Sequence, residues 1–547
     1  MPTSNSGPMT AWTYADIWRS IAQSQPQATA FVHGERTVAW REFDAHANSI
    51  AQHLLAAGLG RQSKVGAYFF NCPEYVCTVA AALKAALTPF NVNYRYGGEE
   101  LVYLLDNADA EALIFDHTFL DTVAQIRLRL PKIQCWIASG AERSALPDWA
   151  QSYEEIVQHT PHDDVRPSWG RHGDDIVLIY TGGTTGLPKG VMWRQGDLLE
   201  YSRRTHPILS LPSVQSADDI VSHAMALPHR VSLIASPLMH AVGQMGSMAA
   251  LLGGAAVAFL PSRKFDAVEL WNEVERLHAS RISLVGVAFC GPMLEALQAH
   301  PGRWDLSCVQ YIGSSGAMWS HENKLGLLKH LPNASLNDSF SSSEAFGMGV
   351  SVSTQGSEAA TGKFVLGPEC ALFTEDGRRI RPGSNERGLL AVGGLIPLGY
   401  YRDPAKTART FPTIEGKRWS MPGDWATVNA DGTLNVLGRG SQCINTGGEK
   451  VFPEEVEEVL KTHPTIRDAA VVGLPDARFG QKICAIVEPR TQAVPSLEDL
   501  AAFVRANLAD FKAPRALVTV AELGRAPNGK LDYKALLMLA TDKVRTA

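Results

Sequence analysis

Residues 181 to 190 bring glycine, hydroxyl and lysine side chains together directly after the apolar run at 176 to 180. The segment is Thr181-Gly182-Gly183-Thr184-Thr185-Gly186-Leu187-Pro188-Lys189-Gly190. Glycine lets backbone N–H groups approach a ligand closely, while the threonine hydroxyls and the lysine supply further donors and positive charge. Phosphate is the group that such a loop binds best. A mobile Gly/Thr surface turn is the alternative interpretation of the same composition.

The spacing excludes the phosphate loop of P-loop NTPases. That loop joins its last glycine directly to Lys and Ser/Thr, whereas Leu187 and Pro188 separate Gly186 from Lys189 here. The ten residues instead resemble the phosphate-binding loop of the adenylate-forming superfamily, which includes acyl-CoA synthetases, peptide-synthetase adenylation domains and firefly luciferase. The resemblance predicts partner motifs further along the chain.

The segment 337 to 344, Asn-Asp-Ser-Phe-Ser-Ser-Ser-Glu, resembles the aromatic-Gly-x-Thr-Glu motif of this family. On its own, an acidic residue after a polar turn is most often a solvated helix cap. The resemblance implies that Phe340 stacks on adenine, that the Ser343 hydroxyl contacts phosphate, and that Glu344 holds Mg²⁺, a cation that prefers oxygen ligands. Phe340 replaces the usual Tyr, and Ser341 replaces the usual Gly.

Two further segments carry nucleotide contacts by resemblance. Ser315, Gly316 and Ala317 match a Gly-Gly-Ala segment that borders the adenine and the acyl pocket, although taken alone they form only a strand-to-helix turn. Asp424 stands where the family has an Asp for the ribose hydroxyls, and Arg439 follows at the spacing of a second ribose or phosphate contact. Asp424 could equally be a loop residue in a Pro-Gly turn.

Lys530 stands in a Pro-Asn-Gly turn near the end of the sequence. On composition alone it would be a solvated tail residue. Residues 523 to 531 are close to the family's Pro-Arg-Thr-x-x-Gly-Lys, and this resemblance makes Lys530 the catalytic lysine. Its ammonium would bridge the substrate carboxylate and the α-phosphate, and would offset the charge that develops there. A mobile domain would allow the lysine to be withdrawn after the first step.

A polar, Gly-rich segment follows Arg439 and predicts a linker into a small C-terminal domain. By resemblance the hinge pivot falls on Ser441, where the family usually has Asp or Lys. Gly447, Gly448 and Glu449 resemble the segment that lines the pantetheine tunnel in the members that use CoA.

Residues 237 to 243, Pro-Leu-Met-His-Ala-Val-Gly, resemble the family's Pro-Leu-Phe-His-x-x-Gly. We assign His240, Gly243 and Gln244 to the wall of the acyl pocket. A lone histidine beside an apolar stretch is more often a core residue than a catalyst, so no acid–base role is assigned to His240.

Strands and helices that alternate along the chain must position these residues. Strands are predicted at 64–70, 89–94, 112–116, 232–236, 255–260, 282–287 and 309–312, and helices at 73–87, 99–106, 244–252, 266–278 and 292–299. Such alternation is typical of parallel sheets covered by helices, with ligands bound at the carboxyl ends of the strands. Residues 141–172 and 205–222 are predicted to be long surface connections.

We therefore expect an α/β fold. Its large N-terminal adenylation domain (1–438) should contain stacked mixed or parallel sheets with helices. A hinge (439–442) should lead to a small mobile α+β domain (443–547).

The composition excludes several other classes of protein. The chain has 547 residues, with 50 basic and 56 acidic side chains and a net charge of −6, which argues against an electrostatic nucleic-acid binder. Its eight cysteines contain no CxxC pair, which favours a reduced, cytoplasmic setting over a disulfide framework or zinc site. No secretory signal is recognised. The most apolar stretch, 245 to 260, is shorter than the roughly 20 residues that a spanning helix needs.

The resemblance implies an AMP-forming acyl-CoA synthetase that uses ATP, Mg²⁺ and coenzyme A as cofactors and co-substrates. It acts on a small-molecule carboxylic acid, by resemblance a long-chain or steroid side-chain acid. Two alternatives stay open within the superfamily, namely an adenylation enzyme that loads a carrier protein and a luciferase-like oxygenase. A non-enzymatic nucleotide-binding regulator is the third. Peripheral membrane contact and a homodimer are left open.

Overall fold

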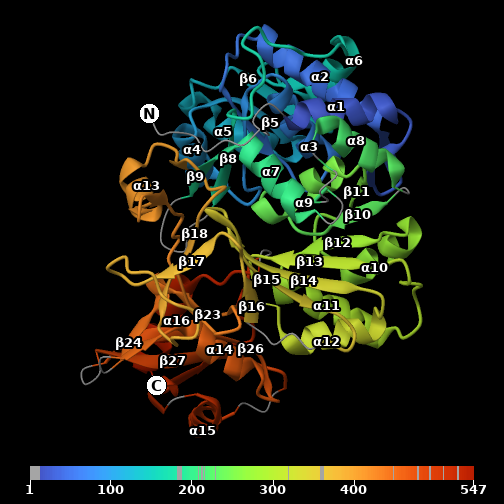
Figure 1. Ribbon diagram of the computed structural model, residues 1–547. Helices are drawn as coiled ribbons and strands as arrows, with labels where there is room; N and C mark the ends of the chain where they lie inside the picture. Colours follow the sequence, from blue (N-terminus) through green and yellow to red (C-terminus); the bar gives the residue numbers. More distant parts are fainter. Residues whose placement is uncertain are drawn as a thin grey trace.

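The computed structural model arranges the chain as two large sheets with helices and a smaller C-terminal sheet (Figure 1). It describes residues 13–181, 188–206, 209–210, 214, 216–227, 230–317, 319–357, 363–446, 449–476, 480–491, 495–508, 510–526 and 529–546.

An eight-stranded sheet forms the upper part of the molecule in Figure 1. In spatial order its strands are β19 (Gly399–Tyr400), β9 (Lys189–Arg194), β8 (Ile176–Thr181), β4 (Thr88–Asn91), β3 (Lys64–Tyr68), β5 (Ala110–Asp116), β6 (Cys135–Ser139) and β7 (Gln151–Ser152). The strands from β8 to β7 are parallel, whereas β9 turns back antiparallel to β8. The predicted phosphate loop therefore connects the two strands of a hairpin.

A thirteen-stranded sheet forms the middle of the molecule. In spatial order its strands are β17 (Cys370–Phe373), β18 (Gly388–Val392), β22 (Asp424–Val428), β23 (Thr433–Arg439), β16 (Lys363–Leu366), β15 (Ala345–Ser353), β14 (Ser335–Ser342), β13 (Tyr311–Ser315), β12 (Arg281–Leu284), β10 (Val231–Ile234), β11 (Ala256–Phe259), β1 (Thr29–His33) and β2 (Arg36–Ala39). The run from β1 to β14 is parallel, and the strands from β15 to β17 pair antiparallel.

Helices lie between and outside these two sheets. The inner ones are α1 (Tyr14–Ser24), α2 (Trp40–Ala56), α3 (Pro73–Lys84), α8 (Ala217–Ala226) and α9 (Ala241–Leu252), whose apolar side chains join one core with both sheets. The outer ones are α4 (Gly98–Asn107) and α5 (Leu120–Ile126) on one side, and α10 (Ala267–Leu277), α11 (Gly286–Ala299) and α12 (His321–His330) on the other. The result is a stack of five layers, helix, sheet, helix, sheet, helix. This part also contains three further helices, α6 (Tyr153–His159), α7 (Gln195–Thr205) and α13 (Pro404–Thr410), and the hairpin of β20 (Thr413–Ile414) and β21 (Lys417–Arg418).

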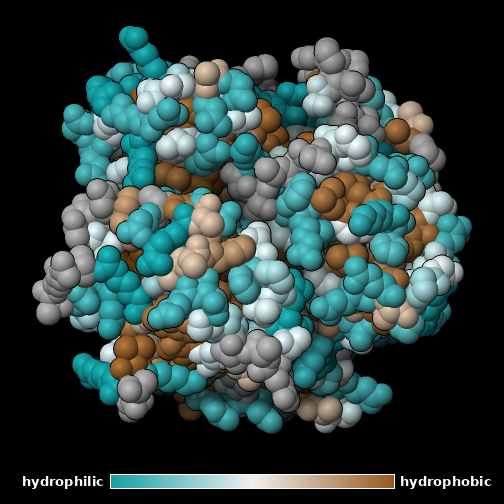
Figure 2. All heavy atoms as spheres, turned by 90° about the horizontal axis from the view of Figure 1, so that it is seen from below, coloured by the Kyte–Doolittle hydropathy of each residue, from teal (hydrophilic) through white to brown (hydrophobic). Residues whose placement is uncertain are grey.

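The C-terminal part has its own five-stranded sheet and two apolar clusters, one on each face. Its strands are β25 (Glu449–Val451), β24 (Ile444–Thr446), β27 (Gly480–Pro489), β26 (Ile466–Asp476) and β28 (Ala516–Thr519), and its helices are α14 (Pro453–Lys461), α15 (Leu497–Asn507) and α16 (Tyr533–Thr546). Pro453 starts α14 because its fixed φ suits the first helical position, where no N–H is needed. The face in Figure 2 shows hydrophobic residues in separate patches among hydrophilic ones.

The expected α/β class with a large and a small domain is confirmed, and three local predictions are wrong. The segments predicted to be surface connections contain α6 and α8, and α8 starts with a Ser216/Asp219 capping box that is visible in the sequence. Helix α11 begins at Gly286, six residues earlier than predicted, with Pro292 inside it. All eight cysteines are free. Within the described residues, no helix has the length and apolarity needed to cross a bilayer.

Candidate active site

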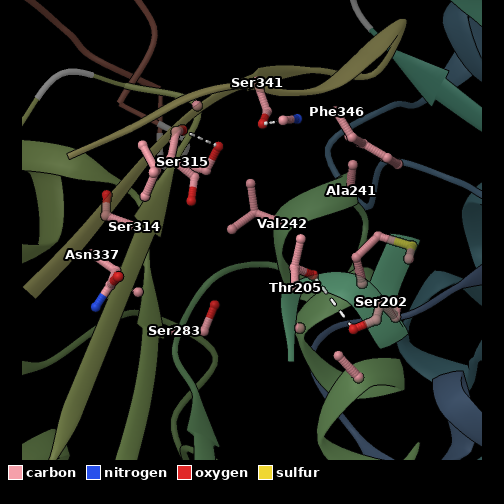
Figure 3. A pocket seen from close by; sticks show the side chains of 18 of the residues that line it. Ser202, Thr205, Ala241, Val242, Ser283, Ser314, Ser315, Asn337, Ser341 and Phe346 are labelled. Atoms are coloured by element: carbon pink, nitrogen blue, oxygen red, sulfur yellow. Dashed lines mark hydrogen bonds between the residues drawn. The ribbon is translucent and has the colours of Figure 1, made fainter. Parts of the chain in front are cut away.

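A cavity of about 620 Å³ lies between the thirteen-stranded sheet and two helices, α7 and α9. Strands β10, β12, β13 and β14 supply one wall, and Lys530 reaches it from the C-terminal domain. Figure 3 shows Ser283 and Asn337 on the strand side, with Val242 and Thr205 on the helix side. A volume of this size is typical of sites that enclose a small organic ligand.

The turn after β13 borders this cavity with two of the three residues that the sequence singled out. Ser315 and Gly316 both line it, and the Ser315 hydroxyl donates a 2.7 Å hydrogen bond to the carbonyl of Ser339 on β14. The neighbouring Ser314 hydroxyl accepts a 2.8 Å hydrogen bond from the N–H of Gly286, the first residue of α11. The first bond links the carboxyl end of β13 to β14, and the second links it to the start of α11.

The tip of the β14–β15 hairpin carries Ser343 and Glu344. Ser343 lines the cavity, and its carbonyl accepts a 2.9 Å hydrogen bond from the Trp193 indole. The Tyr400 hydroxyl donates a 2.6 Å hydrogen bond to Oε1 of Glu344, and the Ser420 hydroxyl donates one to the Glu344 carbonyl. The carboxylate is therefore oriented by Tyr400, a positioning residue that the sequence analysis did not assign. Tyr400 stands in residues 399 to 407, Gly-Tyr-Tyr-Arg-Asp-Pro-Ala-Lys-Thr, which also resemble a motif of the family and could have indicated it.

Phe340 lies away from the cavity lining. Its ring packs 5.5 Å from that of Phe364, while Ser339 and Ser341 on the same strand face the cavity. Successive side chains of a strand point to opposite faces, so the alternation directs Phe340 toward the far side of β14. Phe340 is thus not among the residues that line this cavity, and its stacking on adenine stays a prediction.

The predicted phosphate loop is described only at its ends. Thr181 ends β8 and lines the cavity, and residues 182 to 186 lie outside the described residues. Lys189 begins β9 and forms a 2.5 Å ion pair with Asp403, the N-cap of α13. The hydrogen bond from Lys189 holds the pKa of the Asp403 carboxyl below its usual range. Lys189 is thus engaged by a carboxylate and is not among the cavity-lining side chains.

Asp424 and Arg439 stand directly opposite each other in the ladder of β22 and β23. This register brings together two residues that the sequence separates by fifteen positions. Asp424 is buried, and the Arg439 side chain lies outside the described part of the chain. The same holds for the side chains of Ser441 and Glu449, and for Gly447 and Gly448 altogether.

Lys530 comes into the cavity because its loop packs on the turn after β13. A Cβ placed on Gly529 would lie 3.0 Å from the Cβ of Ala317, so the loop backbone is in close contact with this turn. Burial, reinforced by the charges of Lys530 and Arg95, lowers the pKa of His240 to about 4. His240 is therefore neutral at neutral pH, and Lys530 is the cation at this end of the cavity among the described lining residues.

Of the three predicted pocket residues at helix α9, His240 lines the cavity, whereas Gly243 and Gln244 do not. His240 lines the cavity at the start of the helix, and Gly243 lets the helix approach the preceding segment, since a Cβ there would lie 2.4 Å from the Pro237 carbonyl oxygen. Gln244 is only 1% exposed and does not line the cavity. The Asn91 amide donates hydrogen bonds to the carbonyls of Tyr180 and Met239, which ties the segment before α9 to β8.

Comparison with known proteins identifies the family. The model for AMP-binding enzymes matches residues 18–401. The chain belongs to the AMP-binding enzyme family. The AMP-binding enzyme C-terminal domain matches residues 455–530, so both domains of the adenylate-forming fold are present.

Similar AMP-binding enzymes are CoA ligases. The chain is 36% identical over 530 residues to the medium/long-chain-fatty-acid–CoA/3-oxocholest-4-en-26-oate–CoA ligase of Mycobacterium marinum, covering 96% of each. It is also 36% identical to the 3-oxocholest-4-en-26-oate–CoA ligase of Rhodococcus rhodochrous, over 96% of this chain and 95% of that one. The fold matches that of the anthranilate CoA ligase AuaEII with a TM-score of 0.82 at 21% identity, over 98% and 99% of the two chains. The expected acyl-CoA synthetase branch of the superfamily is confirmed.

Proposed function

We propose that this AMP-binding enzyme joins a bulky, apolar carboxylic acid to CoA, with Lys530 as its catalytic cation. The observation that carries the proposal is the entry of Lys530, from the C-terminal domain, into the cavity that Ser315, Gly316 and His240 line. With His240 neutral, Lys530 is positioned to receive an anionic carboxylate and a phosphate at the same point.

In the first step, a carboxylate oxygen attacks the α-phosphorus of ATP. A new O–P bond forms, the bond from the α-phosphorus to its bridging oxygen breaks, and pyrophosphate leaves. The carboxylate is already a nucleophile, so positioning and charge neutralisation by Lys530 supply the catalysis. In the second step, the CoA thiol attacks the acyl carbonyl and a C–S bond forms. The acyl C–O bond of the mixed anhydride breaks, AMP leaves with its bonding pair, and the thiol proton passes to solvent.

Glu344 is the residue that would hold Mg²⁺. Its carboxylate is half-buried at the hairpin tip and is oriented by Tyr400, next to Ser343 at the cavity. The described residues hold no cluster of three or more His, Cys, Asp or Glu side chains suited to a metal ion. A single carboxylate together with nucleotide phosphates is the donor set that Mg²⁺ commonly takes, so the site fits this ion. Bound there, Mg²⁺ would offset phosphate charge.

We assign the remaining phosphate and ribose contacts from the positions of Thr181, Asp424 and Arg439 in the fold. Thr181, at the cavity, supports phosphate binding by the loop up to Gly186, and Asp424 beside Arg439 supports ribose binding. We assign residues 1–438 to the adenylation domain, 439–442 to the hinge and 443–547 to the mobile domain. Support comes from the end of β23 at Arg439 and the start of β24 at Ile444.

The acid is assigned from the cavity wall and from the relatives. Val242, Met245 and Ala249 face the cavity from α9, and apolar walls of this kind favour an acid with an apolar body. The relatives' names specify fatty acids and a steroid side-chain acid. We extend this substrate class, long-chain or steroid side-chain acids, to the chain.

The test is pyrophosphate release from Mg·ATP across short, aromatic, long-chain and steroid acids, with and without CoA. We expect release with long-chain or steroid acids, and AMP and acyl-CoA only when CoA is present. No release with any acid would overturn the enzyme assignment. Transfer to a carrier protein but not to CoA would favour an adenylation enzyme that loads carriers.

A further inference from the structure

The cavity continues past the reacting end to the amino ends of three neighbouring strands. Arg230 directly precedes β10, Arg281 begins β12 and Tyr311 begins β13, and all three side chains line the cavity. The register pairs Arg281 with Ser232 on one side and with Tyr311 on the other. Because the strands are parallel, these three residues lie together at the end opposite Ser315 and Gly316.

At this far end, the two positive charges of Arg230 and Arg281 face the cavity, and no carboxylate among the described lining residues accompanies them. The Arg281 guanidinium lies 4.2 Å from the centre of the Tyr311 ring, which it covers. Within the described residues, no ion pair involves Arg230 or Arg281, and no Asp or Glu lines the cavity. Burial and the nearby Arg281 charge both lower the pKa of Arg230, and burial together with both arginines lowers that of His206 to about 3. His206 therefore stays neutral, and two half-buried guanidinium groups repel each other.

Between the two ends the helix wall is apolar. Val242, Met245 and Ala249 lie one after another along the cavity side of α9. Tyr311 and Ser315 stand four positions apart along β13, which corresponds to about 13 Å at the rise of a β-strand. A ligand that reaches both ends therefore has a polar group at each end and a chain of roughly ten carbons in all, both end carbons included, given a zigzag of C–C bonds of about 1.5 Å.

We propose that the acid substrate carries a second carboxylate, and that Arg230 and Arg281 bind this carboxylate at the far end of the cavity. The inference rests on the proposed function and narrows its substrate to a dicarboxylic acid with an apolar body. A guanidinium pairs with a carboxylate through two parallel hydrogen bonds. Two guanidinium groups together can donate a hydrogen bond to every lone pair of a half-buried carboxylate. Only the carboxylate beside Lys530 is adenylated. The other keeps its charge and fixes the length of acid that fits.

The experiment compares acids that differ only at the far end. Pyrophosphate release by the full chain is measured with decanoic, ω-hydroxydecanoic and decanedioic acids, and kcat/KM is taken as a ratio to the monoacid. We expect decanedioic acid to exceed decanoic acid about tenfold or more, because hydrogen bonds to charged groups contribute strongly in such a site. Arg281→Gln and Arg230→Gln should each lower the ratio about tenfold, and Arg281→Lys should restore part of it.

Arg303→Gln is the matched control. Arg303 is exposed and covers the Trp304 ring at 4.9 Å, outside the cavity, so its loss removes one charge and one ring contact without changing the ratio. Three outcomes would overturn the inference while the proposed function stands. They are a ratio near one in the wild type, an equal or greater preference for the hydroxy acid, and a ratio that Arg281→Gln leaves unchanged. Absence of pyrophosphate release with every acid would instead overturn the proposed function. Because the readout is a ratio within each variant, partial loss of folded enzyme does not affect it.

Discussion

At the scale of single residues, the charges in the cavity are arranged along its length. Lys530 occupies one end, the two arginines occupy the other, and the histidines beside each end are kept neutral by burial and by those same cations. A neutral histidine adds a hydrogen-bonding surface without adding charge. In the proposed mechanism, Lys530 and Glu344 are the residues whose charges act on the phosphates.

Replacing Lys530 should slow the first half-reaction, adenylation, and leave the second, thioester formation, unchanged. Lys530→Ala is expected to slow pyrophosphate release about 100- to 1,000-fold, as loss of one transition-state donor does elsewhere. Thioester formation from a supplied acyl-adenylate and CoA should remain close to wild type, because that step does not use the lysine. Lys534→Ala, an exposed lysine four residues on in α16, is the control. An equal loss in both half-reactions would contradict the assigned role.

We expect the Tyr400 hydroxyl to affect activity through the binding of Mg²⁺ by Glu344. Tyr400→Phe removes the 2.6 Å hydrogen bond to Glu344 but keeps the ring, so the carboxylate loses its orientation. We expect the Mg²⁺ concentration for half-maximal activity to rise about tenfold, consistent with about 1.5 kcal/mol for a hydrogen bond to a charged group. Tyr401→Phe is the control, since its hydroxyl donates to Asp109 instead. A change in maximal rate alone, at unchanged Mg²⁺ requirement, would argue against a role in positioning Glu344.

At the scale of elements, the site depends on how closely α9 packs against the segment that precedes it. Gly243 allows a contact that no other residue fits, and Asn91 links that segment to β8. The helix thereby holds His240, Val242 and Met245 at the cavity wall. The parallel strands β12, β13 and β14 fix the opposite wall through their register.

Gly243→Ala should therefore cost both stability and activity. The added Cβ would lie 2.4 Å from the Pro237 carbonyl oxygen, so α9 must shift. We expect about 1–3 kcal/mol of destabilisation, as in other overpacked sites, and a raised KM for the acid. Gly291→Ala in α11 is the matched control, because its Cβ would meet only Val287 Cγ1 at 3.9 Å. That variant should be as stable as the wild type or slightly more so. Equal stability of the two variants, measured by urea unfolding, would rule out the contact as the cause.

At the scale of the whole molecule, the C-terminal domain is held against α11 and α12 in the arrangement that places Lys530 in the cavity. Among the residues that the structure describes, two exposed ion pairs join the domains, Arg467 with Glu295 at 4.0 Å and Arg490 with Glu322 at 3.6 Å. Exposed pairs contribute little energy each, which suits the proposed movement of this domain after the first step.

Reversing the charge of Glu295 and Glu322, the acidic partners in these two ion pairs, should slow the adenylation step. The double variant Glu295→Lys and Glu322→Lys is expected to lower pyrophosphate release about threefold, the effect of losing two weak surface pairs. Thioester formation from supplied acyl-adenylate should be unchanged or faster. The matched control reverses Glu100 and Glu142, which are exposed on the N-terminal domain. If higher salt reduces the difference in pyrophosphate release between the double variant and the wild type, the effect is electrostatic. A difference in pyrophosphate release that salt does not change would contradict this explanation.

The sequence by itself determined the family, the two-domain α/β fold and the order of the motifs. Each of these depends on local patterns: alternating apolar runs, glycine-rich turns, and single residues such as Glu344 and Lys530 at fixed places within their motifs. Only the tertiary structure decided which side chains meet. Lys189 pairs with Asp403 over 214 positions, and Tyr400 orients Glu344 over 56. Phe340 faces Phe364 rather than the cavity, and Arg230 and Arg281 come together at its far end. Sheet register and helix packing set such contacts, because they bring together residues that no local pattern connects.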